Sequence, residues 1–517
     1  MWPTTPSPKT EELQAKVAEQ QGQIRWLELK VQDLERQLYG QKSEKNRGEG
    51  ADNNLRWEEL LGQVRALVPE AAAEPTGGEP KNRNAPSEKT GEKKGPKPLD
   101  PALPREVVQL PAPDLGGLMC PVTQRPMQPG FVEVLEVLAR RPAVYYVKRY
   151  ERTVFTSPAK TAPVYTAWPA DVLTGSRVHA SDVAHIAAMH FCEHAPYYRL
   201  EKQLGRLGVD LPRVCQVSLM AQLDQIVAPL VTAAQAQVWA HGYLHLDATP
   251  IDLVDPARPG AVRESTLWAY RATDGPIWFD FQLHKSPTSP AKLLENYRGL
   301  LQTDGASGLD AIGQEGGRIT HLGCFSHARR YLVKAVDAKE AIAAPYLRAI
   351  DQLFRVERLA RHFKLSTERR QQLRNAHSRP LAERLFADAE TALKTAEPKT
   401  RFHQALVYLQ GQRASLLRCL SEPRARIDNN LAEQSIRPLK IGAKNWGQIG
   451  HPNAGPRLAR LFTLIENCRQ EGIDPEAYLL DIIARLPDHP MKRIAELLPR
   501  AWKAARATPT VPAVVIA

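Results

Sequence analysis

Near the amino terminus, apolar residues recur in alternating steps of four and three positions, with charged residues between them. The series comprises Leu13, Val17, Gln20, Ile24, Leu27, Val31, Leu34 and Leu38. This heptad spacing predicts a short coiled coil; the alternative is one amphipathic helix that lies on the chain's own core. We expect this element within an N-terminal helical segment, 1–68.

The following segments lose the helical pattern. Residues 69–113 are rich in Pro, Gly, Lys and Glu, which predicts a disordered basic linker because too little apolar surface is available for a core. In 114–180, runs rich in Val and Tyr at 131–138 and 144–155 predict a small β module. Cys120 resembles half of a metal knuckle whose second cysteine is missing, so we expect no structural zinc there.

Helical spacing returns between residues 181 and 241. One helix is predicted from Tyr197 to Leu207, a turn from Gly208 to Pro212, and a second helix from Val214 to Trp239. This is the outline of a DNA-binding helix-turn-helix, but ordinary helical hairpins share it, so both interpretations stay open. The basic residues in this region are Arg199, Lys202, Arg206 and Arg213.

From Gly242 onward the pattern alternates with a period of two. The predicted strands are Tyr243–Asp247, Thr266–Ala272, Ile277–Leu283 and Ile319–Phe325, and the predicted helices are Pro290–Leu300 and Ser326–Val336. Three strands in a meander followed by strand–helix alternation indicate an α/β protein with a mixed sheet and flanking helices. Residues 338–421 predict helices only, which we interpret as a helical insertion within a domain spanning 242–470.

A further helix is predicted after Arg426, with Asp428 or Asn429 as its cap. Its spacing places Glu433, Arg437 and Lys440 on one face, where a simple Glu433–Arg437 ion pair is the plainest interpretation. Helices at Arg457–Gln470 and Asp474–Leu486 follow, and 471–517 is expected to hold a C-terminal helix and tail.

Length and charge narrow the class of protein. A chain of 517 residues is long enough for several domains. Its 69 Lys and Arg against 57 Asp and Glu give a net charge of +12, which favours a polyanionic partner such as nucleic acid. We expect a cytoplasmic, nucleoid-associated protein without a membrane span, because the start lacks a signal-peptide core and no apolar run reaches about 18 residues. The six cysteines form no Cys-x-x-Cys pair, so neither a disulfide framework nor a zinc knuckle is indicated.

Three carboxylates are the candidates for chemistry. Asp247 ends a predicted strand, Asp304 follows the apolar run Leu300-Leu-Gln-Thr and precedes a glycine, and Glu433 lies on the later helix. Each aspartate alone is most simply a turn or helix-cap residue. Together with Glu433, the two aspartates supply three hard oxygen ligands, which suffice to hold a pair of Mg²⁺ ions for phosphodiester exchange.

At these positions the chain resembles the insertion-sequence-66 transposases, whose large protein carries a DDE triad on an RNase H-like fold. The resemblance is carried by several motifs: Leu246-Asp247-Ala-Thr-Pro250, Leu301-Gln-Thr-Asp304-Gly305, Gly323-Cys324-Phe-Ser-His327-Ala-Arg-Arg330, Asp428-Asn-Asn-Leu-Ala-Glu433-Gln-Ser-Ile-Arg-Pro-Leu-Lys440, Lys444-Asn-Trp446 and Gly472-Ile-Asp-Pro-Glu-Ala-Tyr-Leu479. It extends from the N-terminal heptads to about Pro487.

The resemblance implies roles for particular residues. Asp247, Asp304 and Glu433 would be the catalytic metal ligands for two Mg²⁺ ions, for which Mn²⁺ can substitute. Cys324-x-x-His327 is by itself a weak signal, but the resemblance implies that it supports the active site. The residues expected to contact DNA phosphates are Lys440, Arg437, Lys444, His327, Arg329 and Arg330.

The chain departs from the family pattern at three places. Ala248 stands where the family usually has Glu, and Ala443 where it usually has Arg. The family's two Cys-x-x-Cys pairs are reduced to Cys120, so the β module would be a degenerate zinc finger held by packing alone.

The function expected from these residues is a DDE transposase. It would bind terminal inverted repeats, cut DNA with metal-activated water and join the resulting 3′-hydroxyls to target DNA. Residues 13–38 would pair protomers, and accessory proteins of the element are possible partners. The alternatives are an RNase H-like nuclease without strand transfer and a non-catalytic DNA-binding remnant of a transposase.

Overall fold

The computed structural model describes residues 145–151, 169–173, 176–254, 258, 260–286, 288–305 and 317–507. The predicted coiled coil, the linker, Cys120 and most of the predicted β module lie outside these residues. Of the predicted strand at 144–155, residues 145–151 are described and form no strand. Residues Pro75–Tyr150 belong to a unit separate from the rest of the chain.

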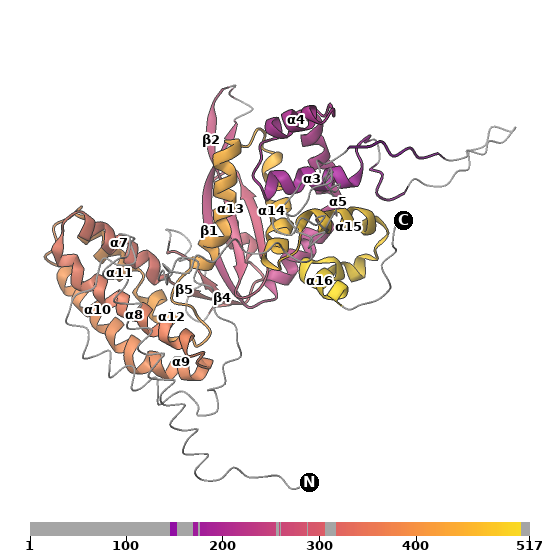
Figure 1. The fold of residues 1–517 in the computed structure, drawn as a ribbon. Helices are drawn as coiled ribbons and strands as arrows, with labels where there is room; N and C mark the ends of the chain where they lie inside the picture. Colours follow the sequence, from indigo (N-terminus) through magenta and orange to yellow (C-terminus); the bar gives the residue numbers. More distant parts are fainter. Residues whose placement is uncertain are drawn as a thin grey trace, which may run out of the picture. The chain divides into compact units, whose positions relative to one another are not determined.

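The centre of the larger unit is a five-stranded mixed sheet (Figure 1). The strands are β1 (Tyr243–Val254), β2 (Val262–Ala272), β3 (Ile277–Gln282), β4 (Gly299–Gln302) and β5 (Ile319–Leu322). Their order is β3-β2-β1-β4-β5. The pairs β3–β2 and β2–β1 are antiparallel, whereas β1–β4 and β4–β5 are parallel. The predicted α/β class and mixed sheet are therefore confirmed.

In the described part of the chain, three helices precede the sheet: α3 (Ala180–Phe191), α4 (Tyr197–Arg206) and α5 (Arg213–Trp239). The predicted helix, turn and helix of 197–239 are therefore present. Among the described residues, α5 alone is long and apolar enough to cross a membrane, a test that core helices of soluble proteins also pass. In this structure α5 makes an interior contact, because Arg460 of the later helix α14 (Ala454–Gln470) binds its buried Asp224 through two hydrogen bonds of 2.6 Å.

Two predictions for the sheet region need correction. The helix predicted at Pro290–Leu300 is only α6 (Thr288–Leu293), and the second half of that range leads into β4. Short apolar runs such as Leu300-Leu301 have no periodicity that separates a buried strand from a helix. The strand predicted to end at Asp247 continues to Val254, because β2 pairs with it along its whole length.

Residues 338–421, the predicted insertion, are helical and share an apolar core with the helix before them, α7 (Phe325–Asp337); we call the two together the insertion. Its elements are α7, a 3-10 turn (Ala341–Ala343), α8 (Ala344–His362), α9 (Thr367–Leu373), a π-helix (Arg374–Ser378), α10 (Arg379–Leu393), α11 (Arg401–Gly411) and α12 (Arg413–Ser421). The chain then returns to the sheet, where helix α13 (Asn430–Trp446) packs on β1 and β2 (Figure 1).

The carboxyl-terminal helices complete the larger unit. They are α13 (Asn430–Trp446), α14 (Ala454–Gln470), α15 (Pro475–Arg485), two 3-10 segments (Leu486–Asp488 and Met491–Leu497) and α16 (Pro499–Ala507). Helix α14 covers the exposed edge of β3. There the backbone N–H of Ile277 donates to Asn467 at 2.9 Å, and that of Phe279 donates to Thr463 at 3.0 Å. An edge strand that is satisfied in this way is closed to pairing with another chain.

Candidate active site

Asp247 lies in the middle of β1, just past the three residues that pair with β4. Because β4 pairs only with Tyr243–His245, that side of β1 opens at the level of Asp247. The Asp247 side chain is half-buried, and its Oδ1 accepts a hydrogen bond from the backbone N–H of Ala248 at 2.8 Å. The carboxylate thus leaves the sheet where a neighbouring strand ends, although its own strand continues.

Asp304 follows the end of β4 by two positions, as predicted. The next residue, Gly305, has a φ of +73°, and a Cβ there would come within 2.7 Å of the Gln412 side chain, so the turn requires glycine. The Tyr408 hydroxyl of α11 donates to the carbonyl oxygen of Asp304 at 2.8 Å. The insertion therefore fixes the backbone that carries this carboxylate.

Glu433 lies in the first turn of α13. Asn429 occupies the cap position, one of the two predicted; its side chain makes no capping bond, and Asp428 Oδ1 accepts the backbone N–H of Asn430 at 3.1 Å. The guanidinium of Arg330, from α7, contacts both carboxylate oxygens of Glu433 at 3.1 and 3.2 Å. The observed ion pair of Glu433 is thus with the insertion, whereas helical spacing suggested Arg437.

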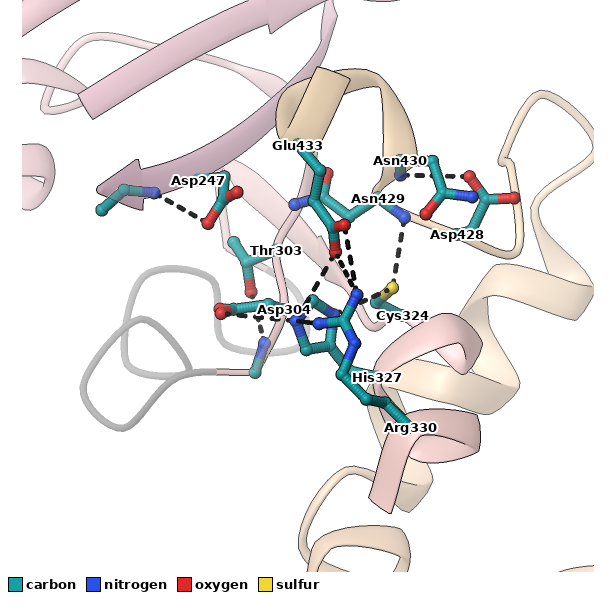
Figure 2. Close-up of polar contacts among 12 residues, drawn as sticks. Asp247, Thr303, Asp304, Cys324, His327, Arg330, Asp428, Asn429, Asn430 and Glu433 are labelled. Carbon is teal, nitrogen blue, oxygen red and sulfur yellow. Dashed lines mark hydrogen bonds and ion pairs between the residues drawn. The ribbon is translucent and has the colours of Figure 1, made fainter. Parts of the chain in front are cut away.

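The structure brings Asp247, Asp304 and Glu433 into one region (Figure 2). Burial raises the pKa of Asp247 to about 7, and the charges of Asp304 and then Glu433 also raise it; the Ala248 N–H and Lys440 act in the opposite direction. Near neutral pH, Asp247 is therefore close to protonation, and a cation beside these oxygens would keep it ionised.

The donor atoms of this region suit a hard divalent cation. Among the described residues, no three His, Cys, Asp or Glu side chains stand close enough to form a ready-made metal cluster. The three carboxylates are nevertheless the oxygen ligands that Mg²⁺ and Mn²⁺ take, and Asp304 and Glu433 lie near enough to Asp247 for their charges to add to the effect of burial on its pKa. On both counts the residues fit a divalent ion.

Cys324 and His327 link the insertion to this region. His327 Nδ1 lies 3.4 Å from Cys324 Sγ, and Arg330 donates to His327 Nε2 at 2.8 Å. His327 Nε2 is 3.6 Å from Glu433 Oε1 and 4.0 Å from Asp304 Oδ2. Burial lowers the pKa of His327, which favours a neutral ring whose Nδ1 carries the proton. The imidazole thus stands between two of the three carboxylates.

Asn429, which the sequence offered only as a helix cap, also joins the start of α13 to β1. Its side chain is buried, its Nδ2 donates to the carbonyl oxygen of Leu246 at 2.8 Å, and its backbone N–H donates to Cys324 Sγ at 3.2 Å. Its Oδ1 lies 3.0 Å from His245 Nδ1. Because burial lowers the pKa of His245 to about 3, the neutral ring donates through Nδ1 and accepts from Thr273 through Nε2.

Gln302 is a second buried clamp that sequence reasoning missed. Its amide nitrogen donates to the carbonyl oxygens of Gly323 at 2.8 Å and Arg426 at 2.9 Å, and its Oε1 accepts from the Tyr243 hydroxyl. These bonds tie β4 to β1 and to the segment before α13. The available signal was a polar residue inside the apolar run Leu300-Leu-Gln, where a buried amide requires partners.

The predicted phosphate-binding residues divide into two groups. Arg437, Lys440 and Lys444 are exposed along α13, and Lys440 is close enough to Asp247 to lower its pKa. Arg330 and His327 contact Glu433 as described above. Arg329 is not brought to the carboxylates, because its Nε binds Asp351 of α8 at 2.6 Å.

Three sequence models of known protein families match successive segments of the chain. A sequence model described as "Transposase IS66 family" matches residues 175–457, which include all three carboxylates. A model described as "IS66 C-terminal element" matches residues 463–500, and one described as "Transposase C of IS166 homeodomain" matches residues 26–108. The first match alone covers more than half of the 517 residues.

Similar chains occur in Sinorhizobium fredii (strain NBRC 101917 / NGR234). The "Uncharacterized protein y4hP" is 27% identical over 507 residues, covering 93% of this chain and 89% of the relative. The "Uncharacterized protein y4jD" is 25% identical over 391 residues, covering 72% of this chain and 75% of the relative. The likeness to the first relative thus extends over nearly the whole chain.

Proposed function

Because the chain belongs to the IS66 transposase family, we propose that it is a DDE transposase that binds the terminal inverted repeats of its element, cuts the DNA and joins the 3′-ends to target DNA. The mixed sheet, with three antiparallel strands followed by two parallel ones, is consistent with an RNase H-like catalytic domain. DNA is the partner that the basic balance of the chain favours.

The observation that carries the proposal is the meeting of three carboxylates from β1, the end of β4 and the start of α13. Asp247 and Asp304 are 57 positions apart in the chain, and Asp304 and Glu433 are 129 positions apart, yet all three lie in one region (Figure 2). The charges of Asp304 and Glu433 both raise the pKa of Asp247. Asp247, Asp304 and Glu433 would hold two divalent ions. When bound, such ions activate an attacking oxygen and stabilise a leaving one in phosphodiester exchange.

The chain's own residues would position the DNA and the carboxylates. Lys440 lies near Asp247 on the exposed side of α13, where its ammonium is placed to bind a phosphate beside the site. Arg330 holds Glu433 through both of its oxygens, and His327 spaces Glu433 from Asp304. Arg437 and Lys444 extend the basic row along α13.

The remaining partners are proposed from the sequence. We expect residues 13–38 to pair protomers, which would bring two element ends together, and proteins encoded beside the transposase to assist it. The matched homeodomain description at 26–108 agrees with DNA binding by the N-terminal region. We expect the protein in the cytoplasm, associated with the nucleoid.

The test is cleavage and strand transfer on paired element ends in Mg²⁺. Asp247→Asn, Asp304→Asn and Glu433→Gln each keep the side-chain shape and remove the charge, so we expect each to abolish both reactions while DNA binding persists. Asp252→Asn, on the same strand, is the matched control and should retain activity. Equal activity of wild type and Asp304→Asn would refute the assignment.

The products of the same assay separate the two alternatives. Nicked ends without joined products would favour an RNase H-like nuclease. DNA binding without any metal-dependent nicking would favour a non-catalytic remnant. Joined products that require all three carboxylates would support the transposase.

A further inference from the structure

Helix α4 presents a basic face on the surface of the molecule. Leu200 and Leu204 are buried on one side of this helix, and the opposite side is exposed. The exposed residues, which we call the α4 basic face, are Tyr198, Arg199, Lys202 and Arg206. Arg199 and Lys202 lie 5.7 and 5.9 Å from the centre of the Tyr198 ring. An aromatic ring interleaved with cations suits a polyanion better than an apolar partner.

A stack of three rings ties α4 to the far end of α13. The His190 ring of α3 stacks on Tyr197, the first residue of α4, at 4.0 Å between ring centres, and lies 5.8 Å from the Trp446 ring. His190 is held in turn by the carbonyl oxygen of Ala195, 2.9 Å from its Nδ1. A Cβ on Gly442 would come within 2.9 Å of Trp446, so glycine is needed for the indole to fold back over α13.

Helix α13 therefore connects the candidate active site to α4. Its exposed basic row, Arg437, Lys440 and Lys444, begins one turn after Glu433. Trp446 is 13 positions after Glu433 (446 − 433). At 1.5 Å per residue this is about 20 Å, or about six base pairs of duplex DNA. Figure 1 shows α4 to the right of the upper end of α13, at the end of this helix that is remote from the insertion.

We propose that the α4 basic face binds the backbone of the DNA duplex that leaves the active site. The duplex runs along the basic row of α13 and reaches α4 about six base pairs from the scissile phosphate. This inference rests on the proposed function, because it takes DNA at the three carboxylates as its starting point. Beyond the proposed function, it assigns duplex DNA as the partner of the α4 basic face and gives the distance along the duplex at which that contact is made.

Two exposed arginines on α10 show a different arrangement. On α10, Arg379 pairs with Glu383 at 3.0 Å and Arg384 pairs with Asp388 at 3.8 Å, each one turn away. Their charges are met within the same helix. Helix α4 contains a single acidic residue, Glu201, whose carboxylate accepts the backbone N–H of Arg213 at 3.3 Å. Net positive charge therefore remains on α4, as phosphate binding requires.

The experiment measures binding of the full-length protein to duplexes of its own element end. The duplexes are trimmed from either side of the cleavage site, from about 14 base pairs to about 4, and anisotropy is read in Ca²⁺ over a range of salt. In wild type, the affinity for DNA should rise once the duplex on one side of the cleavage site is longer than about six base pairs. The variant Arg199→Gln/Lys202→Gln/Arg206→Gln should lose this rise and leave the shortest duplex bound as before.

The salt dependence gives a second, quantitative readout. Loss of three phosphate contacts should reduce the slope of log K against log salt by about 2.7 on the long duplex. Arg379→Gln/Arg384→Gln is the matched control and should leave the slope unchanged. Arg199→Lys/Arg206→Lys keeps the charge and should retain the affinity, because a phosphate contact needs charge more than fork geometry.

Two outcomes overturn the inference: a rise in affinity that survives in the glutamine variant, and a loss that is equal on short and long duplexes. Cleavage and joining by wild type in Mg²⁺ are measured in parallel. If wild type joins DNA ends but the rise in affinity persists in the α4 glutamine variant, this inference is wrong and the proposed function is unaffected. If the rise in affinity is lost in the α4 variant but wild type cuts no DNA, DNA binding by the α4 basic face is supported and the transposase assignment is wrong.

Discussion

At the scale of single residues, the Arg330 guanidinium neutralises Glu433 in the absence of a metal ion. Its guanidinium contacts both carboxylate oxygens at 3.1 and 3.2 Å and donates to His327 at 2.8 Å. A divalent ion that took Glu433 as a ligand would compete with this ion pair. Displaced from Glu433, the Arg330 guanidinium would contact a DNA phosphate, which is the role that the family resemblance implies for it.

We therefore expect Arg330→Gln to change metal binding and catalysis in opposite directions. Without the competing guanidinium, the dissociation constant for Mn²⁺ should fall about two- to fivefold, a modest change because the pair is partly exposed. DNA cleavage at saturating metal should decrease. Paramagnetic resonance titration and single-turnover cleavage measure the two effects. Lys334→Gln removes the same charge one turn along α7 and is the control; weaker Mn²⁺ binding by Arg330→Gln would contradict the competition.

The sequence allowed the carboxylates to be chosen but not the residues that hold them. Asp247, Asp304 and Glu433 follow recognisable motifs, whereas Asn429 and Gln302 act through partners that are distant in the chain. Asn429 binds Leu246, 183 positions away, and Gln302 binds Arg426, 124 positions away. Sequence spacing does not contain such pairings. It indicates only that polar residues within apolar runs, once buried, must have partners.

At the scale of elements, the short π-helix of the insertion organises the segment that leads to α13. Arg374 is fully buried there, and its guanidinium binds Glu357 of α8 at 2.6 and 2.9 Å. It also donates to the carbonyl oxygens of Cys419, Glu422 and Ala425, between 2.8 and 3.2 Å. One side chain thus links α8, the end of α12 and the approach to Glu433.

Replacing Arg374 with methionine should destabilise the protein by about 3–5 kcal/mol, because Glu357 would stay buried without its partner. Urea unfolding measures the change. Arg379→Met, which removes an exposed ion pair within one helix, should cost less than about 1 kcal/mol. Glu357→Leu added to Arg374→Met should recover part of the loss. If the two single arginine variants unfolded alike, Arg374 would have no special role.

Element boundaries show where the sequence pattern was sufficient and where it failed. Helices α4 and α5 were predicted closely because the turn 208–212 interrupts two clear periodicities. The strand predicted to end at Asp247 continues through Pro250 to Val254. Beyond His245 the strand has lost β4 as a neighbour, and a strand with an open edge tolerates proline. Which neighbours a strand has depends on topology, which local pattern does not encode.

At the scale of the whole molecule, transposition requires two element ends to be held together. The described sheet, insertion and terminal helices provide one set of three carboxylates per chain. A second set requires a second copy of the chain. The heptads at 13–38, which lie outside the described residues, are the predicted means of pairing, and they overlap the start of the matched segment 26–108.

We expect Leu27→Glu/Leu34→Glu to convert the assembled protein to monomers, because two carboxylates at apolar seam positions would face each other across the coiled coil. Light scattering after gel filtration measures the change in mass. The monomer should still nick a single element end, since Asp247, Asp304 and Glu433 belong to one chain, but it should not join paired ends. Gln32→Glu/Arg36→Glu adds carboxylates off the seam and should leave assembly and joining intact. A variant that remained assembled, or a monomer that joined paired ends as well as wild type, would show that protomers pair through another part of the chain.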